Sequence, residues 1–103
     1  MYKLVYFVPE SHLEQTKAAV FAAGGGRQGD YDSCAWQCLG EGQFRPQEGS
    51  NPYLGARGRL EKVREYRVEL ICEAGCIREV VGALRGAHPY EEPAYDVIRL
   101  EHF

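Results

Sequence analysis

Apolar positions along the chain follow the period of a strand in some stretches and the period of a helix in others. Residues 2–8 are apolar at nearly every position, which predicts a central strand covered on both faces. Residues 65–72 alternate and predict a second strand. The apolar side of that strand consists of Tyr66, Val68, Leu70 and Cys72. A last strand is expected over residues 95–101.

Two other stretches have the helical period. Ser11 and Glu14 have the spacing of a capping box, so a first helix is expected to begin at His12 and to end at the glycines of residues 24–26. Its inner face would consist of Leu13, Thr16, Val20 and Ala23. A second helix is predicted by apolar residues at positions i, i+3, i+4 and i+7, before the C-terminal signals Arg85 and Gly86. These apolar residues are Ile77, Val80, Val81 and Leu84.

The middle of the chain is less regular. Residues 31–46 are predicted to form a strand pair, with a turn at Gly40-Glu41-Gly42. Residues 46–60 are rich in glycine and proline and have neither period, which indicates a loop. A loop this long in a small domain usually carries function or is ordered by a partner.

The predicted order is β-α-β-β-α-β. This order favours a single domain over residues 1–103 with an α+β, ferredoxin-like sandwich, in which both helices lie on one face of an antiparallel sheet and an extended hairpin carries the long loop. Trp36 and several tyrosines would then lie on strands with an uncovered face. Such a face is typically covered by another subunit, so we expect a homo-oligomer, with a trimer as the first choice.

Charge and composition narrow the partners. A formal charge of −3 and a pI near 5.6 argue against a nucleic-acid partner. No apolar run approaches the roughly 20 residues that span a bilayer, and the N-terminal apolar stretch is too short for a signal peptide. We therefore expect no membrane partner, a cytoplasmic location and reduced cysteines. Both Cys-x-x-x-Cys pairs have a spacing that zinc permits, but without turns around them buried thiols are favoured. The pairs are Cys34 with Cys38 and Cys72 with Cys76.

Residues 88–96 form the most distinctive local motif. Two prolines hold the segment extended, and it carries His88, Tyr90, Glu91 and Glu92. An imidazole nitrogen and carboxylate oxygens suit a divalent metal ion, with Cu or Zn as candidates and His88, Glu91 and Glu92 as ligands. One histidine is short of a closed site, so a partner subunit, or another histidine of the chain, would have to contribute. The alternative is that the prolines shape the entry to the last strand while the acids face water.

A second candidate site lies in the glycine-rich excursion between the first helix and the strand at residue 65. With Tyr90, its proposed ligand-binding residues are Arg27, Tyr31, Trp36, Gln43, Arg45 and Glu48. The two arginines could bind an anion. The alternative is that Trp36 and Phe44 fill core and subunit contacts while the arginines pair with glutamates.

Three segments resemble the YqfO-type NIF-three-like domain: residues 24–55, residues 65–69 and residues 88–96. The resemblance spans nearly the whole chain. It implies a fold similar to the trimeric PII and CutA proteins. The His-Pro-Tyr-Glu-x-Pro segment is also similar to CutA, which implies divalent copper as a possible ligand. PII proteins have a comparable excursion between strands, which helps to bind a ligand at the cleft between subunits. The resemblance therefore implies a ligand cleft between protomers.

The family domain often lies within a larger two-lobed protein that carries a two-metal site, and the present sequence does not include those lobes. We therefore expect a non-enzymatic, oligomeric binding or regulatory module for a metal ion, a small ligand or a protein partner. The alternative is a metal-dependent hydrolase acting on a small phosphorylated substrate, as the names of full-length relatives imply. Such an enzyme needs His, Asp and Glu residues clustered around two ions, whereas the three histidines are scattered at positions 12, 88 and 102.

Overall fold

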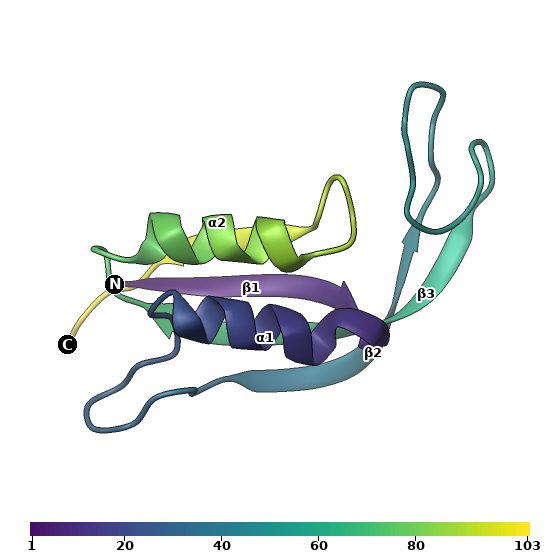
Figure 1. Cartoon of the computed structure of the whole chain (residues 1–103). Helices are drawn as coiled ribbons and strands as arrows, with labels where there is room; N and C mark the ends of the chain where they lie inside the picture. The colour runs from purple at the N-terminus through teal and green to yellow at the C-terminus, as the bar shows by residue number, and fades with distance from the viewer.

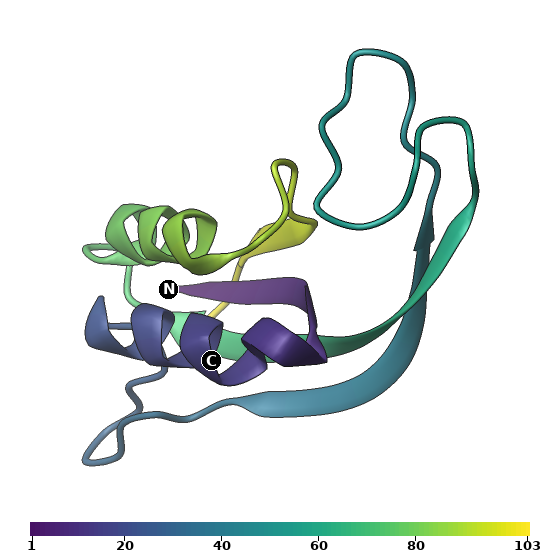
Figure 2. The same ribbon diagram turned by 45° about the vertical axis from the view of Figure 1, so that its right-hand side comes forward.

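The computed structural model describes all residues from Met1 to Phe103. Four strands form one antiparallel sheet in the order β2-β3-β1-β4. They are β1 (Tyr2–Pro9), β2 (Trp36–Phe44), β3 (Glu61–Cys72) and β4 (Tyr95–Arg99). The helices α1 (Leu13–Ala22) and α2 (Ile77–Ala87) lie side by side on one face of the sheet (Figure 1, Figure 2). This arrangement confirms the predicted ferredoxin-like α+β fold.

The core lies between the helices and the central strands β1 and β3. Because side chains alternate along a strand, every second residue of β1 and β3 enters this layer. The buried residues of the layer are Leu4, Tyr6, Val8, Leu13, Val20, Val68, Leu70, Cys72, Val80 and Leu84. The predicted inner faces of β3 and of both helices are therefore confirmed.

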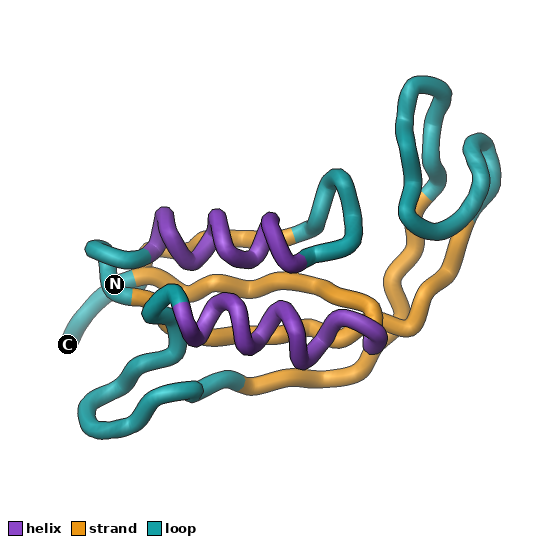
Figure 3. The backbone as a smooth tube through the Cα atoms, viewed as in Figure 1, coloured by secondary structure: helices purple, strands orange, loops and turns teal.

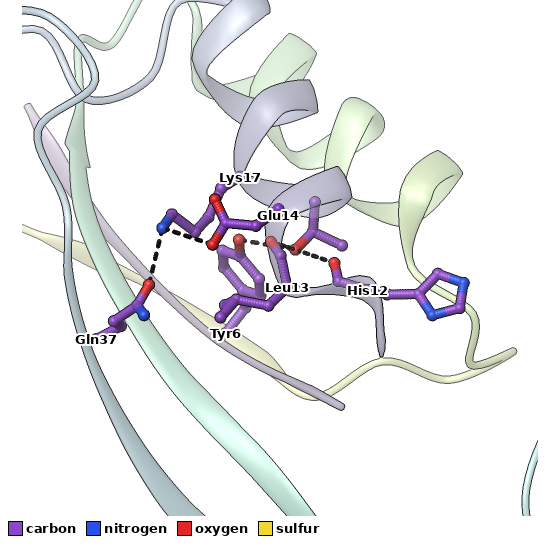
Figure 4. A network of polar contacts seen from close by, with 7 residues as sticks. Tyr6, His12, Leu13, Glu14, Lys17 and Gln37 are labelled. Atoms are coloured by element: carbon purple, nitrogen blue, oxygen red, sulfur yellow. Dashed lines mark hydrogen bonds and ion pairs between the residues drawn. The ribbon is translucent and has the colours of Figure 1, made fainter. Parts of the chain in front are cut away.

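Polar contacts fasten α1 to the sheet (Figure 4). The buried Tyr6 hydroxyl donates to Oγ1 of Thr16 at 3.0 Å, and that hydroxyl in turn donates to a backbone carbonyl at the start of α1. Burial raises the pKa of Tyr6 to about 12, so the phenol stays protonated and keeps this bond. At the edge of the layer, Nζ of Lys17 donates to Gln37 of β2 at 2.9 Å.

The start of α1 differs from the prediction. A 3-10 turn over Glu10–His12 precedes the helix, which begins at Leu13 without a side-chain cap. Oγ of Ser11 bonds to Nδ1 of His12 at 2.8 Å instead of capping the helix, so the predicted capping box is wrong. The predicted helix end is right, since Gly24 has a φ of +109°, which a residue with a side chain rarely adopts.

The predicted strand pair over residues 31–46 is also wrong. Trp36–Phe44 is one continuous strand that passes straight through Gly40 and Gly42 and pairs with β3. The turn of this hairpin is the predicted loop, which lies between Phe44 and Glu61. The two glycines that suggest a turn in the sequence lie within the strand, and both remain paired with β3.

The β2–β3 hairpin extends beyond the rest of the sheet (Figure 1, Figure 3). β1 ends at Pro9, opposite Glu65, so residues 61–64 of β3 pair with β2 alone. The resulting two-stranded ribbon, with the loop at its tip, contributes to a longest dimension of 46 Å, against 25 and 24 Å in the other directions. We refer to residues 41–44 and 61–64 as the ribbon.

The face of the sheet opposite the helices has no covering layer in this chain (Figure 2). Trp36, Glu69, Val5 and Asp96 form one row across it. The side chains of Trp36 and Ile98 are 60% and 49% exposed. Cys38, expected to be buried, is exposed as well, whereas Cys72 is fully buried, and all four cysteines are free thiols. Neither helix has the length and apolar character needed to cross a membrane.

Candidate functional site

A cavity of about 330 Å³ lies where the loop at the tip of the ribbon meets the segment that follows α2. Its walls come from β2 and the loop on one side and from residues 90–94 on the other. The lining residues are Gln43, Phe44, Arg45, Pro46, Gln47, Ser50, Pro52, Tyr53, Leu54, Glu65, Tyr90, Glu91, Glu92 and Ala94. This volume is in the range of small-molecule sites.

Tyr90 connects the two walls of the cavity. Its ring lies 6.0 Å from Phe44 and 6.2 Å from Tyr53, in tilted arrangements. Its hydroxyl donates to Oε2 of Glu65 at 3.1 Å. Burial, and then the nearby Glu65 carboxylate, raise the pKa of Tyr90 well above its usual value, so the hydroxyl remains a donor.

Gly42 makes room for the Glu65 side chain. A Cβ atom at position 42 would overlap Oε1 of Glu65, which lies directly over the backbone of the neighbouring strand. A glycine at this place in β2 therefore allows Glu65 to reach Tyr90. This is a close-approach role, and no unusual backbone angle is involved.

His88 fixes the start of the segment that carries Tyr90. The side chain is only 7% exposed, and both ring nitrogens have partners. Nε2 lies 2.7 Å from the carbonyl oxygen of Phe7, and Nδ1 accepts a bond from the backbone N–H of Tyr90 at 3.1 Å. These partners assign the proton to Nε2. Burial lowers the pKa of His88, which favours the same neutral form.

The loop is held by hydrogen bonds of its own and by one bond across the cavity. The N–H of Gly58 donates to the carbonyl oxygen of Pro46 at 2.6 Å and closes the loop at its base. Across the cavity, the N–H of Asn51 donates to Oε1 of Glu91 at 2.8 Å. The Tyr53 ring also lies edge-on to His12, with centroids 5.7 Å apart. The loop thus packs back onto the body of the domain.

The structure brings together only part of the residues predicted from the sequence. Five of them line this cavity: Gln43, Arg45, Tyr90, Glu91 and Glu92. Arg27 and Tyr31 lie in the connection between α1 and β2, and Trp36 lies on the open face of the sheet. Glu48 belongs to the loop but does not line the cavity.

The residues expected to bind a metal ion do not form a suitable donor set within one chain. His88 uses Nε2 and Nδ1 in hydrogen bonds, so neither nitrogen offers a free lone pair. Glu91 and Glu92 are exposed beside it, and no group of three or more His, Cys, Asp or Glu side chains could hold an ion. His88 therefore positions the backbone here, and a metal at this place would require it to give up both bonds.

The other lining residues, among them Glu65, Tyr53 and Ser50, are not indicated as site residues by the sequence. Glu65 looked like one charge among several in a mixed-charge strand, while Tyr53 and Ser50 lay in a loop without period. The spacing of the two glycines around Glu41 was the available signal, since small residues beside a strand allow close approach.

No family model matches the chain. A protein of Mycobacterium tuberculosis named GTP cyclohydrolase 1 type 2 homolog is 47% identical over 98 residues, which cover 95% of this chain and 26% of that protein. The crystal structure of a Bacillus cereus protein related to NIF3 matches with a TM-score of 0.85 and 44% identity, over 98% of this chain and 26% of that one. The chain thus spans about a quarter of the length of these relatives.

Smaller proteins share the fold at low identity. CutA from Xylella fastidiosa matches with a TM-score of 0.72 and 16% identity, over 99% of this chain and 85% of that one. The PII-like protein CutA from Nostoc matches with a TM-score of 0.69 and 16% identity, over 98% and 82%. The resemblance drawn from the sequence motifs is therefore confirmed: the chain is similar over nearly all its length to one part of the NIF3-related proteins, and it has the fold of CutA and PII-like proteins.

Proposed function

We propose that this chain is a small, non-enzymatic binding module that takes a ligand in the cavity between the ribbon loop and residues 90–94. The observation that carries the proposal is the cavity itself, which is built from residues of all three sequence segments that resemble the NIF-three-like domain. A long loop ordered over aromatic and carboxylate side chains is typical of a ligand site on a rigid scaffold.

A homo-oligomer is part of this proposal, with a trimer favoured. The exposed Trp36 and Ile98 side chains on the uncovered sheet face support association with further copies. A bound protein partner is the other way to cover this face. Light scattering after gel filtration gives the mass of the particle, and Trp36→Glu is expected to reduce it. A monomeric mass for the unaltered chain would refute the homo-oligomer.

An enzymatic role remains tied to the longer relatives. Their name refers to a cyclohydrolase homolog, and this chain corresponds to about a quarter of their length. Three carboxylates line the cavity, but no histidine or cysteine accompanies them there. The chain thus offers neither a cysteine nucleophile nor a histidine base at this site, and we propose that it binds without transforming its ligand.

The binding proposal is tested by amide NMR spectra recorded during addition of a library of small fragments. Fragments that bind are expected to shift the signals of Gln43, Tyr53 and Tyr90 together. Tyr53→Ala should lower the affinity of these fragments, because it removes an aromatic ring from the wall of the cavity. Tyr31→Ala is the matched control, since it removes an exposed tyrosine from a distant loop.

Two outcomes would overturn the proposed site. One is a set of fragments that shift other residues and leave these three unchanged. The other is an equal loss of affinity in the Tyr31 and Tyr53 variants, which would show that the cavity is not the place of binding.

A further inference from the structure

We infer that the cavity between the ribbon loop and residues 90–94 recognises a small organic cation bearing an ammonium group. This inference rests on the proposed binding function and specifies the class of ligand. It departs from the expectation that arginines of the excursion bind an anion, because only one of those two arginines lines the cavity.

The charge of the lining is the first argument. Glu65, Glu91 and Glu92 contribute three negative charges and Arg45 one positive charge, which leaves a formal excess of two negative charges. Clefts lined by one sign of charge concentrate ligands of the opposite sign. An anion would meet three carboxylates and a single guanidinium.

The second argument is that no ion pair within the chain neutralises these carboxylates. The two salt bridges join Lys17 to Glu14 and Arg67 to Glu69, and neither involves a residue of the cavity. The groups that donate hydrogen bonds to the cavity carboxylates are neutral. Tyr90 donates to Glu65 through its hydroxyl, and Asn51 donates to Glu91 through its backbone N–H. Arg85 interacts electrostatically with Glu92 but forms no salt bridge with it, so most of the negative charge remains available to a ligand.

The aromatic walls supply the third argument. The rings of Phe44 and Tyr53 both lie near the ring of Tyr90, with centroid distances of 6.0 and 6.2 Å. A cation within about 6 Å of a ring centroid is attracted to the face of the ring, and quaternary ammonium groups are bound in this way. Rings beside carboxylates are suited to an ammonium group, whereas an anion gains nothing from a ring face.

The size of the space sets the kind of ligand. A cavity of about 330 Å³ lies at the lower end of the range for small-molecule sites. Glu65 is half-buried and held by Tyr90, so it can fix the orientation of the ligand. Glu91 and Glu92 are exposed at the rim, where they attract the cation more than they bind it.

Three probes of similar shape and different charge test the inference: choline, the neutral 3,3-dimethylbutan-1-ol and the anionic 3,3-dimethylbutanoate. Amide NMR titrations follow each probe at low ionic strength. Choline is expected to shift Gln43, Tyr53 and Tyr90 and to bind at least about threefold more tightly than the neutral alcohol. Raising the salt concentration should lower the affinity for choline and leave the affinity for the alcohol unchanged.

Variants identify the groups responsible. Glu92→Gln removes an exposed charge without removing a hydrogen bond of the fold. It is expected to lower the affinity for choline about two- to fivefold. Glu73→Gln is its control, because that exposed acid follows β3 at the opposite end of the sheet. Tyr53→Leu keeps an apolar side chain but loses a ring face, so it should lower the affinity for choline about three- to tenfold.

The outcomes separate this inference from the binding function on which it rests. Equal affinity for choline and the neutral alcohol, or tighter binding of the carboxylate, overturns cation recognition and leaves the cavity as a ligand site. Fragments that bind the cavity while choline does not have the same meaning. If neither fragments nor the three probes shift the lining residues, both proposals fail.

Discussion

The hydroxyl of Tyr90 donates a hydrogen bond to Oε2 of Glu65 at 3.1 Å, which ties the segment after α2 to the point where β3 leaves the four-stranded sheet. The bond spans 25 positions of sequence and sits at the inner wall of the cavity. It depends on Gly42 of the adjacent strand, because any larger residue there would displace the carboxylate.

Gly42→Ala is therefore expected to break the Tyr90–Glu65 bond. The lost bond should lower the free energy of unfolding by about 1 kcal/mol, and the amide signals of Tyr90 and Gln43 should move. Chemical unfolding and NMR spectra measure these two effects. Gly40→Ala is the matched control in the same strand, since its added Cβ would meet nothing closer than a backbone oxygen at 4.0 Å. Equal effects of both substitutions would contradict this account.

His88→Gln should destabilise the domain in a way that depends on pH. At pH 7.5 the loss of the bonds to Phe7 and Tyr90 is expected to lower the free energy of unfolding by about 1 to 3 kcal/mol. Burial places the folded pKa of His88 below its ordinary 6.5, so the unfolded chain takes up the proton first as the pH falls. The stabilisation by neutral His88 is thus present above pH 6.5 and lost as the pH falls through the folded pKa.

Urea unfolding between pH 5 and 8 checks this sign. The difference between the unaltered chain and His88→Gln should shrink toward the acid end. His102→Gln, at the exposed C-terminus, is the control and should change little at any pH. A difference that grows as the pH falls would show that the charged form of His88 is the one that stabilises the fold.

Metal content gives an independent test of the role of His88. After incubation with zinc or copper salts and removal of free metal, the unaltered chain and His88→Gln are expected to contain the same amount by mass spectrometry. The reason is that both ring nitrogens of His88 are occupied by hydrogen bonds. An ion present in the unaltered chain and absent from the variant would restore His88, Glu91 and Glu92 as a metal site.

The four thiols should differ in reactivity. Burial raises the pKa of the Cys72 thiol to about 11, which leaves little thiolate at neutral pH, whereas Cys38 is exposed. Alkylation by iodoacetamide at pH 7.5, followed by peptide mass spectrometry, should modify Cys38 first and Cys72 last. Adding urea should remove the difference, because the protection of Cys72 comes from the fold. Early modification of Cys72 in the folded chain would contradict its burial.

Much of the fold follows from the sequence because its signals are local. The alternation around Val68 and the helical stripe of Val80 and Leu84 each report a buried face, and burial dominates stability. Sequence patterns that fit more than one kind of structure did not predict the fold correctly. Gly40 and Gly42 resembled a turn, and only the register of β2 against β3 shows that they lie within a strand.

The candidate site could be predicted only in part, for the same reason. Tyr90 and Glu91 belong to a recognisable motif, so the sequence alone indicates them as site residues. Which residues face them depends on how the ribbon bends, and this brings Glu65 and Tyr53 to the cavity. Arg27 follows the same glycine-rich stretch in sequence, but the connection after α1 carries it elsewhere. Closeness along the chain was a poor guide there.

The ribbon has a consequence for how a ligand would enter and leave. One wall of the cavity belongs to the four-stranded body, while the other is carried by two strands and a loop that pair with nothing else in the sheet. An isolated pair of strands is marginally stable by itself. Amide hydrogens of residues 61–64 should thus exchange with solvent faster than those of residues 66–72, through local opening of the ribbon. A ligand that bridges the two walls would slow that exchange. Occupancy of the cavity can therefore be measured by the amide exchange rate of the ribbon.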